Sequence, residues 1–96
     1  MRLIAYFTDK EGMLAHRLQY EPAHIAYLQA NQKNILIAGG LRPELNGKFV
    51  GGLWIMEVES FSNAEELIKN DPYYAPDLRD YKLLVWGKAF EGDVVL

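Results

Sequence analysis

Apolar residues recur along this chain with two different periods, and the order of these periods restricts the fold more than any other feature. Short apolar runs predict strands over residues 1–7, 34–38, 49–59 and 81–90. Helical spacing predicts helices over residues 13–33 and 62–70. The order strand, helix, strand, strand, helix, strand predicts an α+β fold of the ferredoxin-like βαββαβ type, in which both helices cover one face of an antiparallel sheet.

Size and composition narrow the class further. With 96 residues, half of them apolar, the chain suits a single domain over residues 1–96 around one core. The absence of cysteine excludes disulfides and thiolate chemistry. A net charge of -3 at pH 7, with Lys and Arg scattered along the chain, predicts no nucleic-acid partner. No apolar run approaches the roughly 20 residues of a membrane span, so we expect no membrane partner and a cytoplasmic location.

The strand patterns predict self-association. Within residues 49–59, Trp54 and Met56 share one face while Leu53 and Ile55 share the other, so both faces are largely apolar. Helices on one side leave the second face bare, and a bare apolar face of this size is more than monomers usually expose. We therefore expect a homodimer of the dimeric α+β barrel type, with ordinary exposed apolar residues as the alternative.

Pro22 divides the first helical segment. A proline inside a helix removes a backbone hydrogen bond, whereas at the first helical position it costs nothing, so residues 21–24 predict either the start of a second helix or a sharp kink. If a helix starts there, His24 lies in its first turn, where the helix dipole favours a neutral imidazole beside a bound anion. A structural hydrogen bond at the helix end is the alternative for His24.

Pro72 gives the second helix its end. The helix is predicted to begin at a Ser-x-x-Glu capping box over residues 62–65 and to stop near Asn70, because Pro72 disfavours helical dihedral angles at Asp71. An aspartate at this position is commonly a turn residue. The alternative is that Asp71 orients His24 as the carboxylate of a catalytic pair does, since both helices lie on the same sheet face.

Other motifs for chemistry are absent from the sequence. Only His16 and His24 offer neutral bases near pH 7, and no phosphate-binding loop or hydrolase motif is present. Two histidines do not form a metal site, and Asp71 or Asp77 would have to complete one without any ligand spacing that suggests it. We expect no metal and no cofactor. The loop over residues 70–76 is expected to border a pocket, with Tyr73 or its neighbour as an aromatic wall, unless these rings pack in the core or the dimer interface.

Four short segments together resemble the YCII-related family. They are Arg17, Pro22-Ala23-His24, Ala38-Gly39-Gly40 and Asp71-Pro72-Tyr73, and their order and spacing extend over residues 1–90. The resemblance implies a dimeric ferredoxin-like fold with a His–Asp pair as the active centre, here His24 and Asp71, in a pocket near the dimer interface. One member of the family is regarded as a dehydrochlorinase. The chain departs from the family pattern at Glu21, where an Arg is common, and at Gly39-Gly40, where Gly-Pro is common.

Two classes of function follow. In the first, the chain is an enzyme of lyase or isomerase type: His24 takes a proton from a small polar organic substrate, and Asp71 holds the imidazole. Arg17, Gly39, Gly40 and Tyr73 are the expected substrate-binding residues. The two glycines form either a tight turn after their strand or amide donors for an oxyanion. In the second class, the chain is a non-catalytic ligand-binding or regulatory dimer that uses the same pocket.

Overall fold

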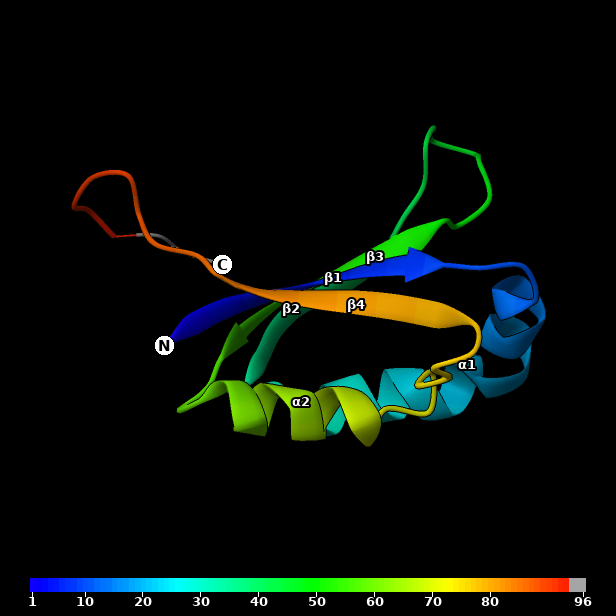
Figure 1. Cartoon of the computed structure of the whole chain (residues 1–96), viewed down its shortest axis with the longest axis horizontal. Coiled ribbons are helices and arrows are strands. Elements are labelled where there is room, and N and C mark those ends of the chain that lie inside the picture. Colours follow the sequence, from blue (N-terminus) through cyan, green and yellow to red (C-terminus); the bar gives the residue numbers. More distant parts are fainter. Residues whose placement is uncertain (94–96) are drawn as a thin grey trace.

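Four strands and two helices alternate in the predicted order. The computed structural model describes residues 1–93. Its elements are β1 (Arg2–Asp9), α1 (Met13–Ala30), β2 (Ile35–Leu41), β3 (Gly51–Glu57), α2 (Phe61–Lys69) and β4 (Arg79–Val85). The strands form one antiparallel sheet in the order β2-β3-β1-β4, and both helices lie against the same face (Figure 1). This is the ferredoxin-like α+β fold, so the predicted fold class is confirmed.

The core lies between the sheet and the helices. Every second residue of the two central strands faces the helices and is at most 3% exposed: Leu3, Ala5, Phe7, Trp54 and Met56. The rings of Phe7 and Trp54 meet edge to face, with centroids 5.2 Å apart. Aromatic pairs prefer this geometry, so the two rings help fix the register of the neighbouring strands. The period-two pattern thus separates the two faces of the sheet, and the structure shows that the face of Trp54 and Met56 is the one under the helices.

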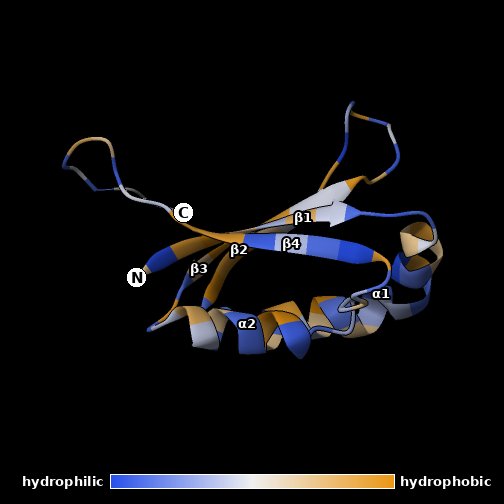
Figure 2. Ribbon diagram, in the orientation of Figure 1, coloured by the Kyte–Doolittle hydropathy of each residue, from blue (hydrophilic) through white to orange (hydrophobic). Residues whose placement is uncertain are grey.

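The opposite face of the sheet carries no helix (Figure 1). β4 begins with hydrophilic residues and ends with hydrophobic ones (Figure 2), so this face is apolar in its middle and polar towards its ends. Strand pairing places Ile37, Ile55, Ile4 and Leu84 side by side in a row across all four strands. We call these four residues the open-face row. Ile37 is 44% exposed and Leu84 is 51% exposed, whereas Ile55 is covered by its neighbours. Within residues 1–93, no helix has the length and apolar character needed to cross a membrane.

Pro22 lies inside α1 and does not begin a second helix. In Figure 1 the ribbon of α1 changes direction between its blue beginning and its cyan end, which agrees with the predicted kink. Pro22 lacks an N–H group and its ring crowds the carbonyl of Leu18 one turn earlier, so the helix bends while it continues. His24 is therefore not in the first turn of a helix. The prediction that the dipole of a helix start favours a neutral His24 imidazole beside a bound anion is therefore wrong.

The boundaries of α2 differ from the prediction at one end only. Ser60 caps the helix, and its hydroxyl accepts a hydrogen bond from the Asn63 amide at 3.1 Å. The predicted capping box over residues 62–65 is thus placed two residues too late. Ser60 precedes the helix in extended conformation and takes the cap, whereas Ser62 already lies within its first turn. At the other end Asn70 is the C-cap, so the predicted stop is confirmed.

Gly39 and Gly40 do not form a turn. Both lie within β2, where they pair with Leu53 and Gly52 of β3, so the strand runs to Leu41 and not to residue 38. At the other edge of the sheet, β4 ends at Val85, and the predicted continuation of this strand to residue 90 is wrong.

Gly51 supplies a stability test. A Cβ atom added at Gly51 would lie 2.1 Å from the carbonyl oxygen of Phe7, and backbone cannot yield as a flexible side chain can. We expect Gly51→Ala to lower the free energy of unfolding by about 1–3 kcal/mol, as overpacking does. Gly39→Ala is the matched control, because nothing lies within 4 Å of its added Cβ. Urea denaturation measures both variants, and equal stability of the two would contradict the close packing of β1 on β3.

Candidate functional site

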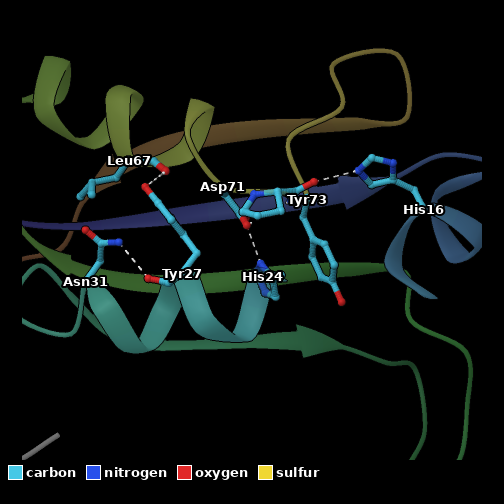
Figure 3. A network of polar contacts seen from close by, with 8 residues as sticks. His16, His24, Tyr27, Asn31, Leu67, Asp71 and Tyr73 are labelled. Atoms are coloured by element: carbon cyan, nitrogen blue, oxygen red, sulfur yellow. Dashed lines mark hydrogen bonds and ion pairs between the residues drawn. The ribbon is translucent and has the colours of Figure 1, made fainter. Parts of the chain in front are cut away.

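His24 and Asp71 meet on the helix-covered face of the sheet. His24 lies in α1 and Asp71 lies just after α2, and the His24 Nδ1 atom is 2.5 Å from Asp71 Oδ1 (Figure 3). The same oxygen accepts the amide N–H of Tyr73 at 3.1 Å. Both side chains are almost completely buried. Because a carboxylate only accepts hydrogen bonds, Nδ1 carries a proton, and in the neutral imidazole the lone pair is on Nε2.

Tyr73 covers the imidazole. Its ring lies parallel to the His24 ring, with centroids 3.6 Å apart and planes inclined by 6° (Figure 3). Burial raises the pKa of the Tyr73 phenol above its ordinary value, and the nearby Glu21 carboxylate adds to the shift. The phenol therefore keeps its proton at neutral pH and acts as a neutral aromatic wall that can still donate a hydrogen bond.

His16 ties the loop of Asp71 and Tyr73 back to α1. Its Nε2 atom lies 3.1 Å from the carbonyl oxygen of Pro72, and a carbonyl only accepts, so His16 Nε2 is the donor (Figure 3). The bond joins two segments 56 residues apart in the chain. Each histidine thus uses one ring nitrogen: His16 bonds through Nε2 and joins the loop to α1, whereas His24 bonds through Nδ1 and its Nε2 has no partner among the described residues.

Three charged side chains form a buried cluster beside this pair. The Asp9 carboxylate accepts from Arg17 Nε at 3.1 Å through one oxygen and from Arg79 Nε at 2.6 Å through the other. All three side chains are at most 10% exposed. The β1–β4 register places Asp9 opposite Arg79, and α1 brings in Arg17. We call Asp9, Arg17 and Arg79 the charge cluster.

Sequence reasoning missed two members of the charge cluster. Asp9 follows an apolar strand and looks like an ordinary polar strand end. Arg79 precedes the last strand and looks like a solvated residue. Only the pairing of β1 with β4 shows that they are partners, because the two residues are 70 positions apart. In the sequence, Asp9 and Arg79 can be noticed only because each lies at the boundary of a strand. Many exposed charged residues lie at strand boundaries too, so this position does not predict burial.

Arg17 is largely engaged by the protein itself. Besides Asp9, its guanidinium donates to the carbonyl oxygen of Gly51 at 2.7 Å and lies 4.6 Å from the centre of the Phe49 ring. Phe49 packs so closely on Gly40 that a Cβ added there would lie 2.4 Å from the ring. Glycine at position 40 therefore permits Phe49 and Arg17 to approach the strand.

A small cavity joins these groups. Its volume is about 20 Å³, and it is lined by Arg17, His24, Gly39, Gly40, Gly52, Trp54, Tyr73 and Arg79. We call it the His24 cavity. Five of the six residues predicted for the site line it, while Asp71 lies behind His24 and lines a neighbouring cavity of about 10 Å³. A volume of this size holds about one water molecule.

A larger hollow lies elsewhere on the molecule. It measures about 380 Å³, and it is formed by Arg2 and by residues 86–90, 92 and 93 near the C-terminus. Its walls contain neither histidine nor any member of the charge cluster. The His24 cavity is smaller, but it is lined by a histidine and two arginines, so we take it as the candidate site. Among the described residues, no group of three or more His, Asp or Glu side chains could hold a metal ion.

Together the sheet order, the two helices and the buried histidine define a ferredoxin-like α+β protein with a polar site under its helices. The sequence model of the YCII-related domain matches residues 1–87, and the chain belongs to this family. The Protein YciI sequences of Escherichia coli O6:H1 and Shigella flexneri are each 31% identical over 88 residues, covering 84% of this chain and 90% of the relative.

A solved structure shares the fold over nearly the whole chain. It is the 5-chloro-2-hydroxyhydroquinone dehydrochlorinase of Burkholderia phenoliruptrix AC1100 in complex with 2,5-dihydroxybenzoquinone. The two chains superpose with a TM-score of 0.78 at 27% identity, over 91% of this chain and 94% of the other. The predicted family resemblance is thus confirmed, and the similar structure is a small-molecule enzyme.

Proposed function

We propose that this chain is a small-molecule enzyme of lyase or isomerase type in which His24 is the general base and Asp71 orients it. The observation that carries the proposal is the 2.5 Å contact between His24 Nδ1 and Asp71 Oδ1, which directs the lone pair of Nε2 away from the carboxylate. No described residue provides Nε2 with a partner. Every fully buried side-chain nitrogen of the described chain has one, so Nε2 is accessible from the cavity side.

The surroundings of His24 suit proton transfer. When Nε2 takes a proton from carbon or oxygen of the substrate, the imidazolium that forms is stabilised by Asp71 on one edge and by the parallel Tyr73 ring on its face. The proton then returns to another substrate atom in an isomerisation, or leaves with solvent after a group is eliminated. A positioned base contributes about 10²–10⁴-fold to the rate.

Substrate entry requires a wall of the His24 cavity to move, since the cavity holds only about one water. Phe49 does not line the cavity, but its ring packs against the wall residues Arg17 and Gly40. It is 37% exposed and belongs to the long connection between β2 and β3, so it has freedom to move. This connection extends beyond the sheet (Figure 1). We propose that outward movement of the Phe49 ring opens the site beside Arg17 and Gly40.

A panel of small organic molecules tests the proposed function. The panel contains 5-chloro-2-hydroxyhydroquinone, on which the structurally similar enzyme acts, and small enolisable acids. Release of chloride or loss of the substrate absorbance reports turnover. We expect the wild type to turn over at least one compound. The small volume of the cavity favours the alternative, a ligand-binding dimer without chemistry. Binding without turnover across the whole panel would support that alternative.

We further propose that the chain forms a homodimer through the open-face row, whereas the His24 cavity lies on the helix-covered face of the same sheet. The row is apolar, it spans all four strands, and a second copy of the same face would cover it. Sheets that pack face to face bury such rows in pairs.

Sedimentation at micromolar concentration tests the dimer. We expect a mass of twice 11.0 kDa for the wild type and a shift towards monomer for Ile37→Glu, because the substitution places a charge in the open-face row. Leu18→Glu is the matched control, since Leu18 is 79% exposed on α1, away from the sheet. A wild-type monomer with no dependence on concentration would contradict this prediction.

A further inference from the structure

Arg79 carries hydrogen-bond donors that the protein does not use. Its side chain is only 6% exposed, and its Nε donates to Asp9, yet neither terminal nitrogen has a partner among the described residues. No fully buried side-chain nitrogen in the described chain lacks a partner, so these terminal nitrogens border accessible space. Arg79 lines both the His24 cavity and the neighbouring cavity of about 10 Å³. Its Nη2 atom lies on the side of the His24 cavity, because a Cβ added at Gly52, another residue of that wall, would lie 3.6 Å from it.

Two guanidinium groups share the single carboxylate of Asp9 in the charge cluster. Asp71 and Glu21 are further carboxylates near Tyr73, but Asp71 Oδ1 accepts from His24 Nδ1 and the Tyr73 amide. Among the described residues, Asp9 is the one carboxylate that accepts a hydrogen bond from Arg79. An anionic ligand beside Arg79 would therefore give its terminal nitrogens an acceptor that the protein does not supply.

Arg79 is held in place before any ligand binds. Its guanidinium lies 4.7 Å from the centre of the Phe7 ring and 5.8 Å from that of Tyr73, while Asp9 fixes Nε. The guanidinium of Arg17 is 5.4 Å from the same Tyr73 ring, whose face stacks on His24. A ligand atom in contact with Arg79 is therefore brought close to the base.

We propose that Arg79 is a substrate-binding residue and that, with the help of Arg17, it binds an anionic oxygen of the substrate. The fork of a guanidinium matches a carboxylate or the ionised oxygen of an enol or phenol. The substrate is accordingly a small organic anion whose reacting hydrogen faces His24 Nε2. The inference rests on the proposed function for the location of the substrate, but it is tested by binding and not by turnover.

The proposed role of Arg79 is tested by measuring ligand affinity with calorimetry on the full chain. Two matched pairs of anionic and neutral probes are compared. 2,5-Dihydroxybenzoquinone, which is bound in the similar enzyme, is compared with neutral hydroquinone, and benzoate is compared with neutral benzamide. The proteins are the wild type, Arg79→Gln, Arg79→Lys and, as a control of the same charge change, Arg42→Gln. Arg42 is exposed and does not line the cavity.

We expect the wild type to prefer one anion or both over the neutral partner, and the preferred pair identifies the type of oxygen. Arg79→Gln should weaken anion binding about 10- to 100-fold, as loss of a hydrogen bond to a charged group does, and leave the neutral probe unchanged. Arg79→Lys should recover part of the loss, and Arg42→Gln should change affinity less than about twofold. Circular dichroism checks that each variant is folded. If Arg79→Gln does not fold, the loss of anion affinity is measured with Arg79→Lys only.

Two outcomes would overturn the inference. One is a wild type that shows no preference for either anion. The other is anion binding that is equally tight in the wild type and in the Arg79 variants. His24→Gln separates this inference from the proposed function: loss of turnover with intact anion binding supports both, whereas Arg79-dependent binding without any His24-dependent turnover supports this inference alone.

Discussion

Replacing His24 with alanine is expected to lower kcat by about 10²–10⁴-fold, because the variant loses the general base and keeps the rest of the cavity. Asp71→Asn is expected to cause a loss of similar size. The asparagine amide can present its NH₂ group to Nδ1, and the imidazole then carries its proton on Nε2, where the lone pair is needed. Steady-state kinetics with the substrate found in the panel measures both effects.

Asp77→Asn is the matched control for the carboxylate. Asp77 lies in the same connection between α2 and β4, but its side chain is exposed and lines none of the cavities around His24. We expect its kcat to stay within about twofold of the wild type. Unchanged turnover in a folded His24→Ala variant would remove the proposed mechanism, and the His24–Asp71 contact would then be structural only.

Asp9→Asn is expected to lower the free energy of unfolding by about 3–5 kcal/mol, the cost of breaking a buried ion pair by removing one partner. The substitution preserves the size of the side chain and removes its charge, so Arg17 and Arg79 are left buried without a counterion. Urea denaturation followed by circular dichroism measures the change as a shift of the midpoint at constant slope.

Asp80→Asn is the control for this second prediction. Asp80 also pairs with a cation, Lys10, at 3.4 Å, but both side chains are at least half exposed. Exposed ion pairs contribute about 0–1 kcal/mol, so the control should be nearly as stable as the wild type. A loss below about 1 kcal/mol for Asp9→Asn would show that solvent or a mobile side chain compensates the two guanidiniums.

Local patterns in the sequence were sufficient to predict the fold class. The alternation of apolar residues in β1 and β3 and the helical spacing in α2 reflect which side of each element faces the core, and this is decided within a few residues. The stop at Pro72 is equally local, since the proline ring restricts only the residue before it. These features determine the element order, and the order leaves few arrangements of the sheet.

The tertiary structure alone decided three matters. Pro22 bends α1 without ending it, because packing on both sides of the proline outweighs one lost hydrogen bond. Gly39 and Gly40 continue β2, because pairing with β3 outweighs their preference for turns. Asp9 and Arg79 become partners only when β1 and β4 are adjacent.

One part of the candidate site was likewise predicted from the sequence, and another part is known only from the tertiary structure. His24 and Asp71 were predicted from two prolines and a family resemblance, and the structure shows that their side chains meet at 2.5 Å. The charge cluster beside them was not predicted, because Arg17 alone was singled out and its partners Asp9 and Arg79 are unremarkable within their own segments. The sequence by itself therefore determined the elements and the pair at the helix-covered face. Only the folded chain determined the buried charges around it, because a pairwise electrostatic contact depends on distance in space and has no local sequence signal.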